Sequence, residues 1–196
     1  MTRAANIFFG LFTLGTVIAV AVVQPANVDP RQKAIEDYRD WQCITPEAVN
    51  MAPWIAKLCR VAPEYGRDNP HIRTFFKVFV NDKAKSMMNA PEPRFPVGSV
   101  IVKEKFEVPS GSQPKKLDKP NLLTVMVKRE KGFDGPNGDW EYFTAAGNGK
   151  PSSADLSVKH CQSCHLGKKS TDYTFRTYGD GKRVASNLQS LLVQHP

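Results

Sequence analysis

The stretch LLTVMVKREKGFDGPNGDWEYFTAA, residues 122–146, decides the architecture of this chain. Two apolar segments, LLTVMVKRE (122–130) and WEYFTAA (140–146), flank the turn KGFDGPNGD, which is rich in Gly, Asp, Asn and Pro. Apolar segments of this length on either side of such a turn are typical of a β-hairpin. The stretch therefore predicts two antiparallel strands that are neighbours in a sheet.

Two further strands are predicted upstream, separated by a short helix or loop over residues 83–94. Residues 74–80 alternate with period two, and so do residues 100–108. In the second of these strands one side is apolar, and it consists of Val100, Val102, Phe106 and Val108. The alternation turns Lys103 and Lys105 to the opposite side. It turns Glu104 inward, where a carboxylate needs a partner.

Residues 31–65 have the spacing of helices instead. Apolar residues recur there every three or four positions, and Thr45 with Pro46 resembles the start of a new helix. The fold class predicted is α+β. It has a mainly antiparallel β-sheet of about four strands, an N-terminal helical segment and a Cys-rich C-terminal segment after the last strand.

The N-terminus predicts export. Arg3 precedes an uncharged apolar run from Ile7 to Val23, and Ala19-Val20-Ala21 is a small-x-small cleavage pattern. Residues 1–26 are therefore a predicted signal peptide, with an uncleaved membrane anchor as the alternative. The remainder, residues 31–196, is expected to form one domain in the periplasm or another exported compartment.

The charge balance favours a particular kind of partner. The chain of 196 residues has 27 basic and 19 acidic side chains, for a net charge of +8. The basic residues are spread along the chain with no run of five or more, so a nucleic-acid-binding arm is not indicated. A generally basic surface suits an anionic partner protein, lipid head group or small molecule.

The segment HCQSCHLGKKS, residues 160–170, contains the motif with the clearest chemistry. In Cys-x-x-Cys-His, two thiols bind the vinyl groups of a haem and the following histidine binds its iron. Cys161, Cys164 and His165 are therefore the predicted attachment residues of one covalent haem c, with His165 as the metal ligand. A redox dithiol or a zinc site fits less well, because the motif follows an antiparallel meander and His160 lies too close to complete a tetrahedron.

Two cysteines remain outside this motif, Cys43 and Cys59. In an oxidising compartment they are expected to form a disulfide. Two buried free thiols are the alternative.

Several stretches resemble the cytochrome P-460 / cytochrome c′-beta family. They are FPVGSVIVKEKF (95–106), LLTVMVKREKGFDGPNGDWEYF (122–143) and CQSCHLGKKSTDYTFRTY (161–178), and PHIRTFFKVFVN (70–81) is similar to the family's first strand. The resemblance covers about residues 65–180. It implies a mainly antiparallel sheet with helices, and a homodimer formed through that sheet. It also implies a haem held by the C-terminal histidine with the other side of the iron open.

The resemblance leaves two branches open. One branch oxidises hydroxylamine and has a lysine crosslinked to the haem, and the other caps the iron with phenylalanines and binds nitric oxide. Lys103 matches the crosslink position and Lys105 is the fallback. The candidates for a cap are Phe75, Phe76 and Phe106. Because alternation turns Lys103 away from the apolar side, the sequence favours the cap.

Three functions follow from these observations. The first is an exported monohaem cytochrome with an open iron that binds nitric oxide or a related small nitrogen species, or transfers electrons. The second is a hydroxylamine-oxidising enzyme that passes electrons to a redox partner protein, with Glu104, Glu130 or Glu141 as the candidate base. The third is a plain electron carrier whose sixth ligand is one of Met87, Met88, Met126 and His71.

Overall fold

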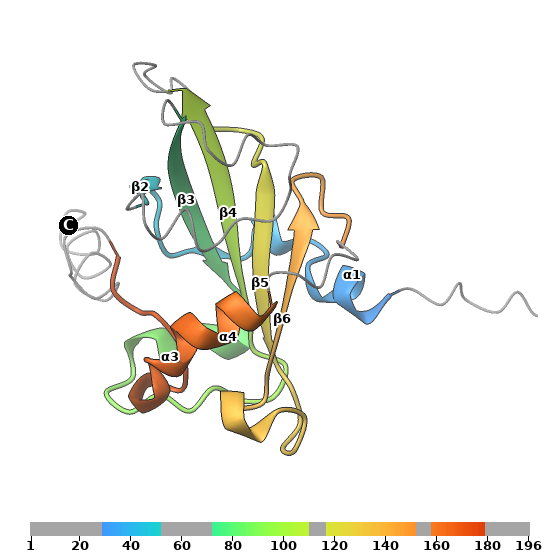
Figure 1. The fold of residues 1–196 in the computed structure, drawn as a ribbon, viewed down its shortest axis with the longest axis vertical. Coiled ribbons are helices and arrows are strands. Elements are labelled where there is room, and N and C mark those ends of the chain that lie inside the picture. Colours follow the sequence, from blue (N-terminus) through green and yellow to red (C-terminus); the bar gives the residue numbers. More distant parts are fainter. Residues whose placement is uncertain (1–28, 52–71, 110–116, 152–157, 179–196) are drawn as a thin grey trace, which may run out of the picture.

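An antiparallel β-sheet forms the centre of the structure (Figure 1). The computed structural model describes residues 29–51, 72–109, 117–151 and 158–178. The strands are β1 (Gln42–Cys43), β2 (Val49–Asn50), β3 (Ile72–Val80), β4 (Val100–Pro109), β5 (Leu122–Lys128) and β6 (Trp140–Ala146). Their order in the sheet is β1-β3-β4-β5-β6, and β2 also pairs with β3. The mixed α+β class predicted from the sequence is confirmed.

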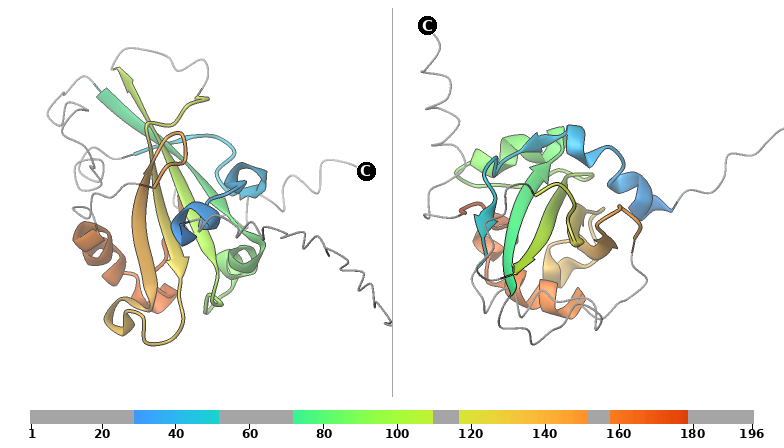
Figure 2. Two further views of the ribbon diagram at one scale, coloured as in Figure 1. Left: turned by 90° about the vertical axis from the view of Figure 1, so that its right-hand side faces the viewer. Right: turned by 90° about the horizontal axis from the view of Figure 1, so that it is seen from above.

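The helices lie on both sides of this sheet. The α-helices are α1 (Pro30–Ala34), α3 (Asp82–Asn89) and α4 (Val158–Leu166). Short 3-10 turns are η1 (Tyr38–Asp40), η3 (Gly135–Asn137) and η5 (Lys169–Thr171). In the view from above, α1 and α4 lie on opposite sides of the strands (Figure 2). Among the described residues no helix is both long and apolar enough to cross a membrane. The predicted signal peptide or anchor, residues 1–26, lies outside them.

The predicted hairpin is confirmed. β5 and β6 pair antiparallel from Leu122↔Ala146 to Lys128↔Trp140. The turn between them is closed by Asp139, whose Oδ1 accepts hydrogen bonds from the backbone N–H of Gly132 (3.1 Å) and of Asp134 (2.9 Å). Asp suits such turns because its short carboxylate accepts from backbone donors that the ladder cannot reach.

The prediction that a helix begins at Thr45 is wrong. Residues 42–50 instead contribute β1 and β2, which pair with β3 as Gln42↔Val80 and Val49↔Phe76. The hydroxyl of Thr45 does not cap a helix. It accepts a hydrogen bond from the backbone N–H of Val78 (2.7 Å). Tertiary pairing with the edge of β3 therefore overrides the local helix signal. The rest of the predicted helical segment, residues 52–65, lies outside the described residues.

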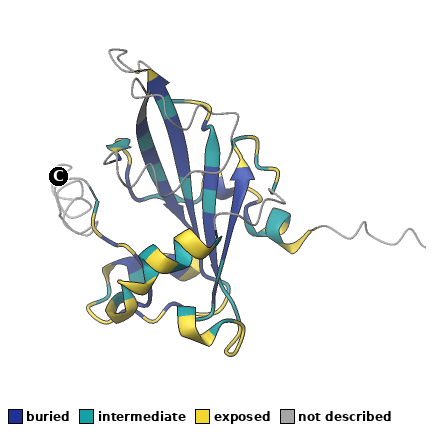
Figure 3. Ribbon diagram, viewed as in Figure 1, coloured by how far each residue is buried: buried dark blue, intermediate teal, exposed yellow. Residues whose placement is uncertain are grey.

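Both faces of the sheet are covered, and each has its own hydrophobic cluster. We call them the α4 face and the α1 face. On the α4 face the cluster includes Val78, Ile101, Met126, Trp140 and Tyr142, together with Met88 of α3 and Tyr173. On the α1 face it includes Phe79, Val102, Val125 and Phe143, together with Ile35 and Tyr38. Figure 3 shows the strands largely buried and the outer side of α4 exposed.

β4 carries polar side chains into both faces. Glu104 points to the α1 face, as predicted from alternation, and is only 4% exposed. Its Oε1 accepts hydrogen bonds from the Tyr38 hydroxyl (2.7 Å) and from Arg39 Nε (3.1 Å). Burial, and then the carboxylate of Glu104, raise the pKa of Tyr38 well above its usual value. This cluster attaches the N-terminal segment to the sheet.

Replacing Tyr38 with Phe should lower the free energy of unfolding by about 1–3 kcal/mol, because a buried carboxylate loses one of its donors. The ring and its edge contact with Phe79 are retained in this variant. Urea unfolding followed by far-UV circular dichroism measures the change. Tyr178→Phe is the matched control, since its hydroxyl donates to an exposed carbonyl of Phe175, and a loss of similar size there would contradict the explanation.

Candidate haem site

The three residues of the Cys-x-x-Cys-His motif all lie on α4. Their spacing of three and four residues puts Cys161, Cys164 and His165 on one side of the helix. Val158 and Cys161 pack against the cluster on the α4 face, so this side of α4 is turned toward the sheet. The structure therefore brings the predicted attachment residues together against the strands.

The turn of the hairpin fixes the position of α4. Gln162, between the two cysteines, donates from Nε2 to Asp134 Oδ2 (2.8 Å). Asp134 is itself held by the Nδ2 group of Asn137, at 2.9 and 3.1 Å from its two carboxylate oxygens. The KGFDGPNGD segment thus closes the hairpin and also docks the motif helix. The sequence alone indicates only the first of these roles.

His165 is held in one orientation by its surroundings. Its Nδ1 lies 2.6 Å from the carbonyl oxygen of Tyr173, so Nδ1 carries the proton and donates it. The ring lies between Tyr142, with centroids 5.1 Å apart, and Phe175, at 5.0 Å. A hydrogen bond of this kind fixes the tautomer and leaves Nε2 as the ligand for a metal.

The imidazole of His165 is also kept neutral. Burial, as the main cause, lowers its pKa from 6.5 to about 4, and the positive charge of Lys103 acts in the same direction. Only the neutral ring has a lone pair for iron. The environment therefore favours the protonation state that axial ligation requires.

Lys103 lies on the same face as this histidine. Pairing places Val78, Lys103, Thr124 and Thr144 side by side across four strands. The ammonium nitrogen of Lys103 is 5.4 Å from the centroid of the Phe76 ring. Lys103 is half-buried there, and its positive charge contributes to lowering the pKa of His165.

The two lysines of β4 lie on the side of the strand opposite Val100, Val102 and Phe106, as the alternation predicts. The alternation itself is correct, since Lys103 and Glu104 point to opposite faces. However, the sheet is covered on both faces, and Lys105 is only 4% exposed. The side of β4 opposite its apolar residues is the side that faces the motif helix.

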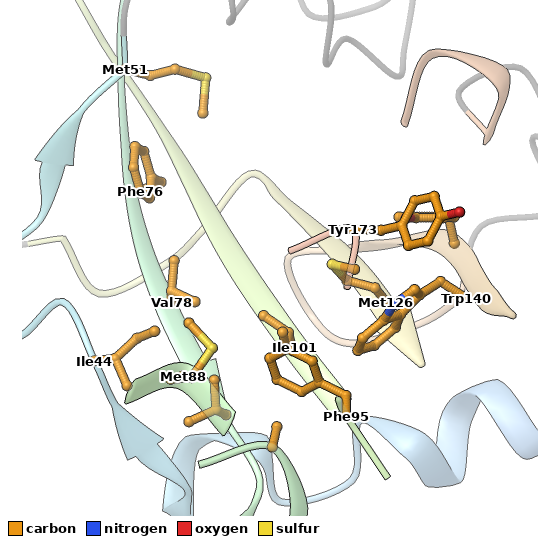
Figure 4. Packing of buried hydrophobic residues seen from close by; sticks show 13 residues of the cluster. Ile44, Met51, Phe76, Val78, Met88, Phe95, Ile101, Met126, Trp140 and Tyr173 are labelled. Carbon is orange, nitrogen blue, oxygen red and sulfur yellow. The ribbon is translucent and has the colours of Figure 1, made fainter. Parts of the chain in front are cut away.

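The three phenylalanines proposed as a cap divide between the faces. Phe76 belongs to the cluster on the α4 face, and Figure 4 shows it near Met51, at the end of the cluster away from Trp140 and Tyr173. Phe75 and Phe106 are paired across β3 and β4, in register with the side chains of the α1 face. Of the three, Phe76 alone shares a face with His165.

The strand carboxylates proposed as a base lie away from the motif. Glu104 accepts its hydrogen bonds on the α1 face. On the same face, the carboxylate of Glu141 accepts hydrogen bonds from Arg31 (3.1 Å) and Arg129 (3.1 Å). Glu130 is largely exposed in a contact with Arg129 (3.6 Å). These ion pairs favour structural roles for all three carboxylates.

The methionines proposed as a sixth ligand all lie in or against the cluster on the α4 face. Met88 and Met126 are buried within it, and Met87 packs against it. His160 is exposed at the surface of α4, as expected for a histidine without a ligand role. His71 lies outside the described residues.

The residues facing α4 fit a haem group. Two hydroxyls on β6, of Tyr142 and Thr144, are buried and have no hydrogen-bond partner within the described parts of the chain. Burial, followed by nearby Cys161, raises the pKa of Tyr142 well above its usual value, so this hydroxyl remains a donor. Buried donors are normally paired, and a polar acceptor bound on this face would satisfy them. Two thiols, a neutral imidazole with its Nε2 open, and these donors match the needs of a haem.

These features make up a candidate haem site on a Cys-x-x-Cys-His helix. The model of the cytochrome P460 family matches residues 35–176, and the chain therefore belongs to the cytochrome P460 family. Membership in this family implies a haem c protein with iron at its centre. A search of curated proteins finds no match to the chain.

Replacing both Cys161 and Cys164 with Ser should abolish covalent haem, because both predicted thioether bonds are lost. Haem peroxidase staining after denaturing electrophoresis measures this directly. Cys43→Ser, on a different part of the chain, should leave the staining intact. Full staining of the double variant would refute attachment through these thiols.

The predicted disulfide between Cys43 and Cys59 stays a prediction, because Cys59 lies outside the described residues. Cys43 is half-buried, its Sγ donates to the Thr45 carbonyl (3.3 Å), and burial raises its pKa. Mass spectrometry of non-reduced peptides should show the two residues joined. Recovery of both as alkylated thiols from native protein would contradict the prediction.

Proposed function

We propose that the chain is an exported monohaem c-type cytochrome of the lysine-crosslinked kind, which oxidises hydroxylamine. Cys161 and Cys164 would hold the haem as thioethers, and the imidazole of His165 would bind its iron. The amine of Lys103 would be bonded to a carbon of the porphyrin. Forming that bond replaces one N–H and one C–H bond, and a peroxide supplied from outside the chain would be the two-electron oxidant that is reduced to water. The proposal is supported by one observation above all, which is that Lys103 lies on the sheet face that His165 contacts through Tyr142.

The environment of Lys103 suits a residue bonded to a large apolar group. It has Val78 on one side and Thr124 on the other, and its amine lies over the Phe76 ring. Such surroundings leave the half-buried side chain only partly in contact with solvent. Position and environment therefore both favour a lysine directed into the haem pocket over one directed to solvent.

When bound, the haem supplies an iron that accepts electrons from a nitrogen ligand. The chain would hold His165 as a neutral imidazole for the iron and would admit hydroxylamine to the haem. The oxidation would pass electrons to a partner protein and release protons to solvent water. Glu107 is the carboxylate that β4 carries on the α4 face, but it lies four residues from Lys103, about 13 Å along the strand. It is too far away to take a proton beside Lys103 directly.

The electrons must then leave to another protein. A redox partner with an acidic surface suits the net charge of +8. We place the protein in the periplasm or another exported compartment, because its N-terminal segment resembles a signal peptide or anchor. The resemblance to the family also implies a homodimer formed through the sheet, and we include it in the proposal.

Nitric oxide binding at an open iron is the second candidate function. It is favoured by Phe76, the aromatic side chain proposed as a cap that lies on the α4 face. In that case Lys103 remains an unmodified amine near the haem. The two candidates therefore differ in one chemical bond.

A tryptic digest distinguishes them. Trypsin does not cut after a modified lysine, so a crosslinked protein should yield one species containing haem, residues 160–168 and residues 95–105. Without the crosslink, residues 95–103 are released as a separate peptide and the haem remains on 160–168 alone. Mass spectrometry identifies either product.

Lys103→Ala should then return an ordinary c-type visible spectrum and lose hydroxylamine oxidation, while keeping both thioethers. Lys105→Ala is the control, two residues along the same face of β4, and should keep the third bond. The nitric oxide function would be favoured instead if the wild-type haem were bound through two thioethers only and Lys103→Ala bound ligands unchanged.

A further inference from the structure

The hydrogen bond to His165 comes from a backbone turn in an unusual conformation. Tyr173, whose carbonyl accepts from Nδ1, has a φ of 60°, and the preceding Asp172 has a φ of 50°. Two successive residues with side chains in the left-handed region are disfavoured by their Cβ atoms. Something in the surrounding structure must therefore hold this turn in place.

Asp172 provides that support from both its backbone and its side chain. Its carbonyl oxygen accepts from Trp140 Nε1 (2.9 Å). Its carboxylate accepts from the backbone N–H of Phe95 (2.8 Å) and from Lys128 Nζ (2.7 and 2.9 Å). The carboxylate and the ammonium are both largely buried, with side-chain exposures of 9% and 14%.

The ring of the next residue is fixed as well. Tyr173 is buried against Gly138, where an added Cβ would lie 2.3 Å from the ring, and its hydroxyl donates to the Pro136 carbonyl (3.2 Å). The backbone N–H of Tyr173 donates to the Lys168 carbonyl (2.8 Å). Tyr173, whose carbonyl accepts from His165, is thus held by its ring, its hydroxyl and its backbone N–H.

We propose that Asp172 is a positioning residue for the axial ligand. Its buried ion pair with Lys128 holds the Tyr173 carbonyl against His165 Nδ1 and so strengthens His165 as an electron donor to iron. The inference rests on ligation of haem iron by His165, and it is independent of whether hydroxylamine or nitric oxide is the ligand.

The physical reason lies in the imidazole. A strong acceptor at Nδ1–H increases electron density at Nε2, which favours the ferric over the ferrous state. Weakening that acceptor should raise the reduction potential of the haem and lengthen the bond between iron and histidine. Both changes are observable in the intact haem protein without any assay of activity.

Asp172→Asn tests the proposal. Asparagine retains an oxygen for the Phe95 N–H but loses the charge that pairs with Lys128. In the ferrous protein, resonance Raman spectroscopy should show the iron–histidine stretch at lower frequency, and redox titration should show a higher potential. Lys128→Met, which breaks the pair from the other side, should change both readouts in the same direction.

Two variants serve as controls. Lys128→Arg retains a cation and should give values close to the wild type. Glu141→Gln neutralises a carboxylate in an ion pair on the α1 face and should leave stretch and potential unchanged, even if stability falls. In-gel haem staining of each variant shows separately that covalent haem is present.

An unchanged stretch and potential in both Asp172→Asn and Lys128→Met would overturn the proposal, even with a loss of thermal stability, because the pair would then be structural only. If Asp172→Asn does not fold, Lys128→Met decides by the same readouts. Absence of covalent haem from the wild-type protein would be a different failure, that of the haem site itself.

Discussion

The central sheet is buried on both faces, and this constraint determines the arrangement of the site. Each long strand has to supply two sets of side chains that pack against different elements. β4 meets the requirement with Val102 and Glu104 toward the N-terminal segment, and Ile101 and Lys103 toward the motif helix. Because the register is fixed by apolar packing on two sides, the polar residues between those apolar positions are fixed too.

The sequence predicts much of this fold because the strands alternate so regularly. The spans of β3 to β6 and the inward direction of Glu104 follow from period two and from the turn residues. The segment after Trp41 does not, because Thr45 and Pro46 match a helix start locally. Pairing with β3 is a long-range interaction, and a local pattern has no information about it.

Less of the site than of the fold could be predicted from the sequence. The motif identifies the three predicted attachment residues from spacing alone. It does not tell which face of the sheet they approach, so the sequence did not show that the side of β4 with Lys103 faces the motif helix. Asp172 and Tyr173 were missed as well. Their role depends on a left-handed turn, and neither residue type gives a strong signal for one.

The geometry of β4 also has an evolutionary consequence. The backbone at position 103 is held by strands on both sides, so a substitution there changes the side chain on the α4 face and leaves the register of the strand in place. A lineage with this fold can therefore vary that side chain at one codon and inherit the supporting core unchanged.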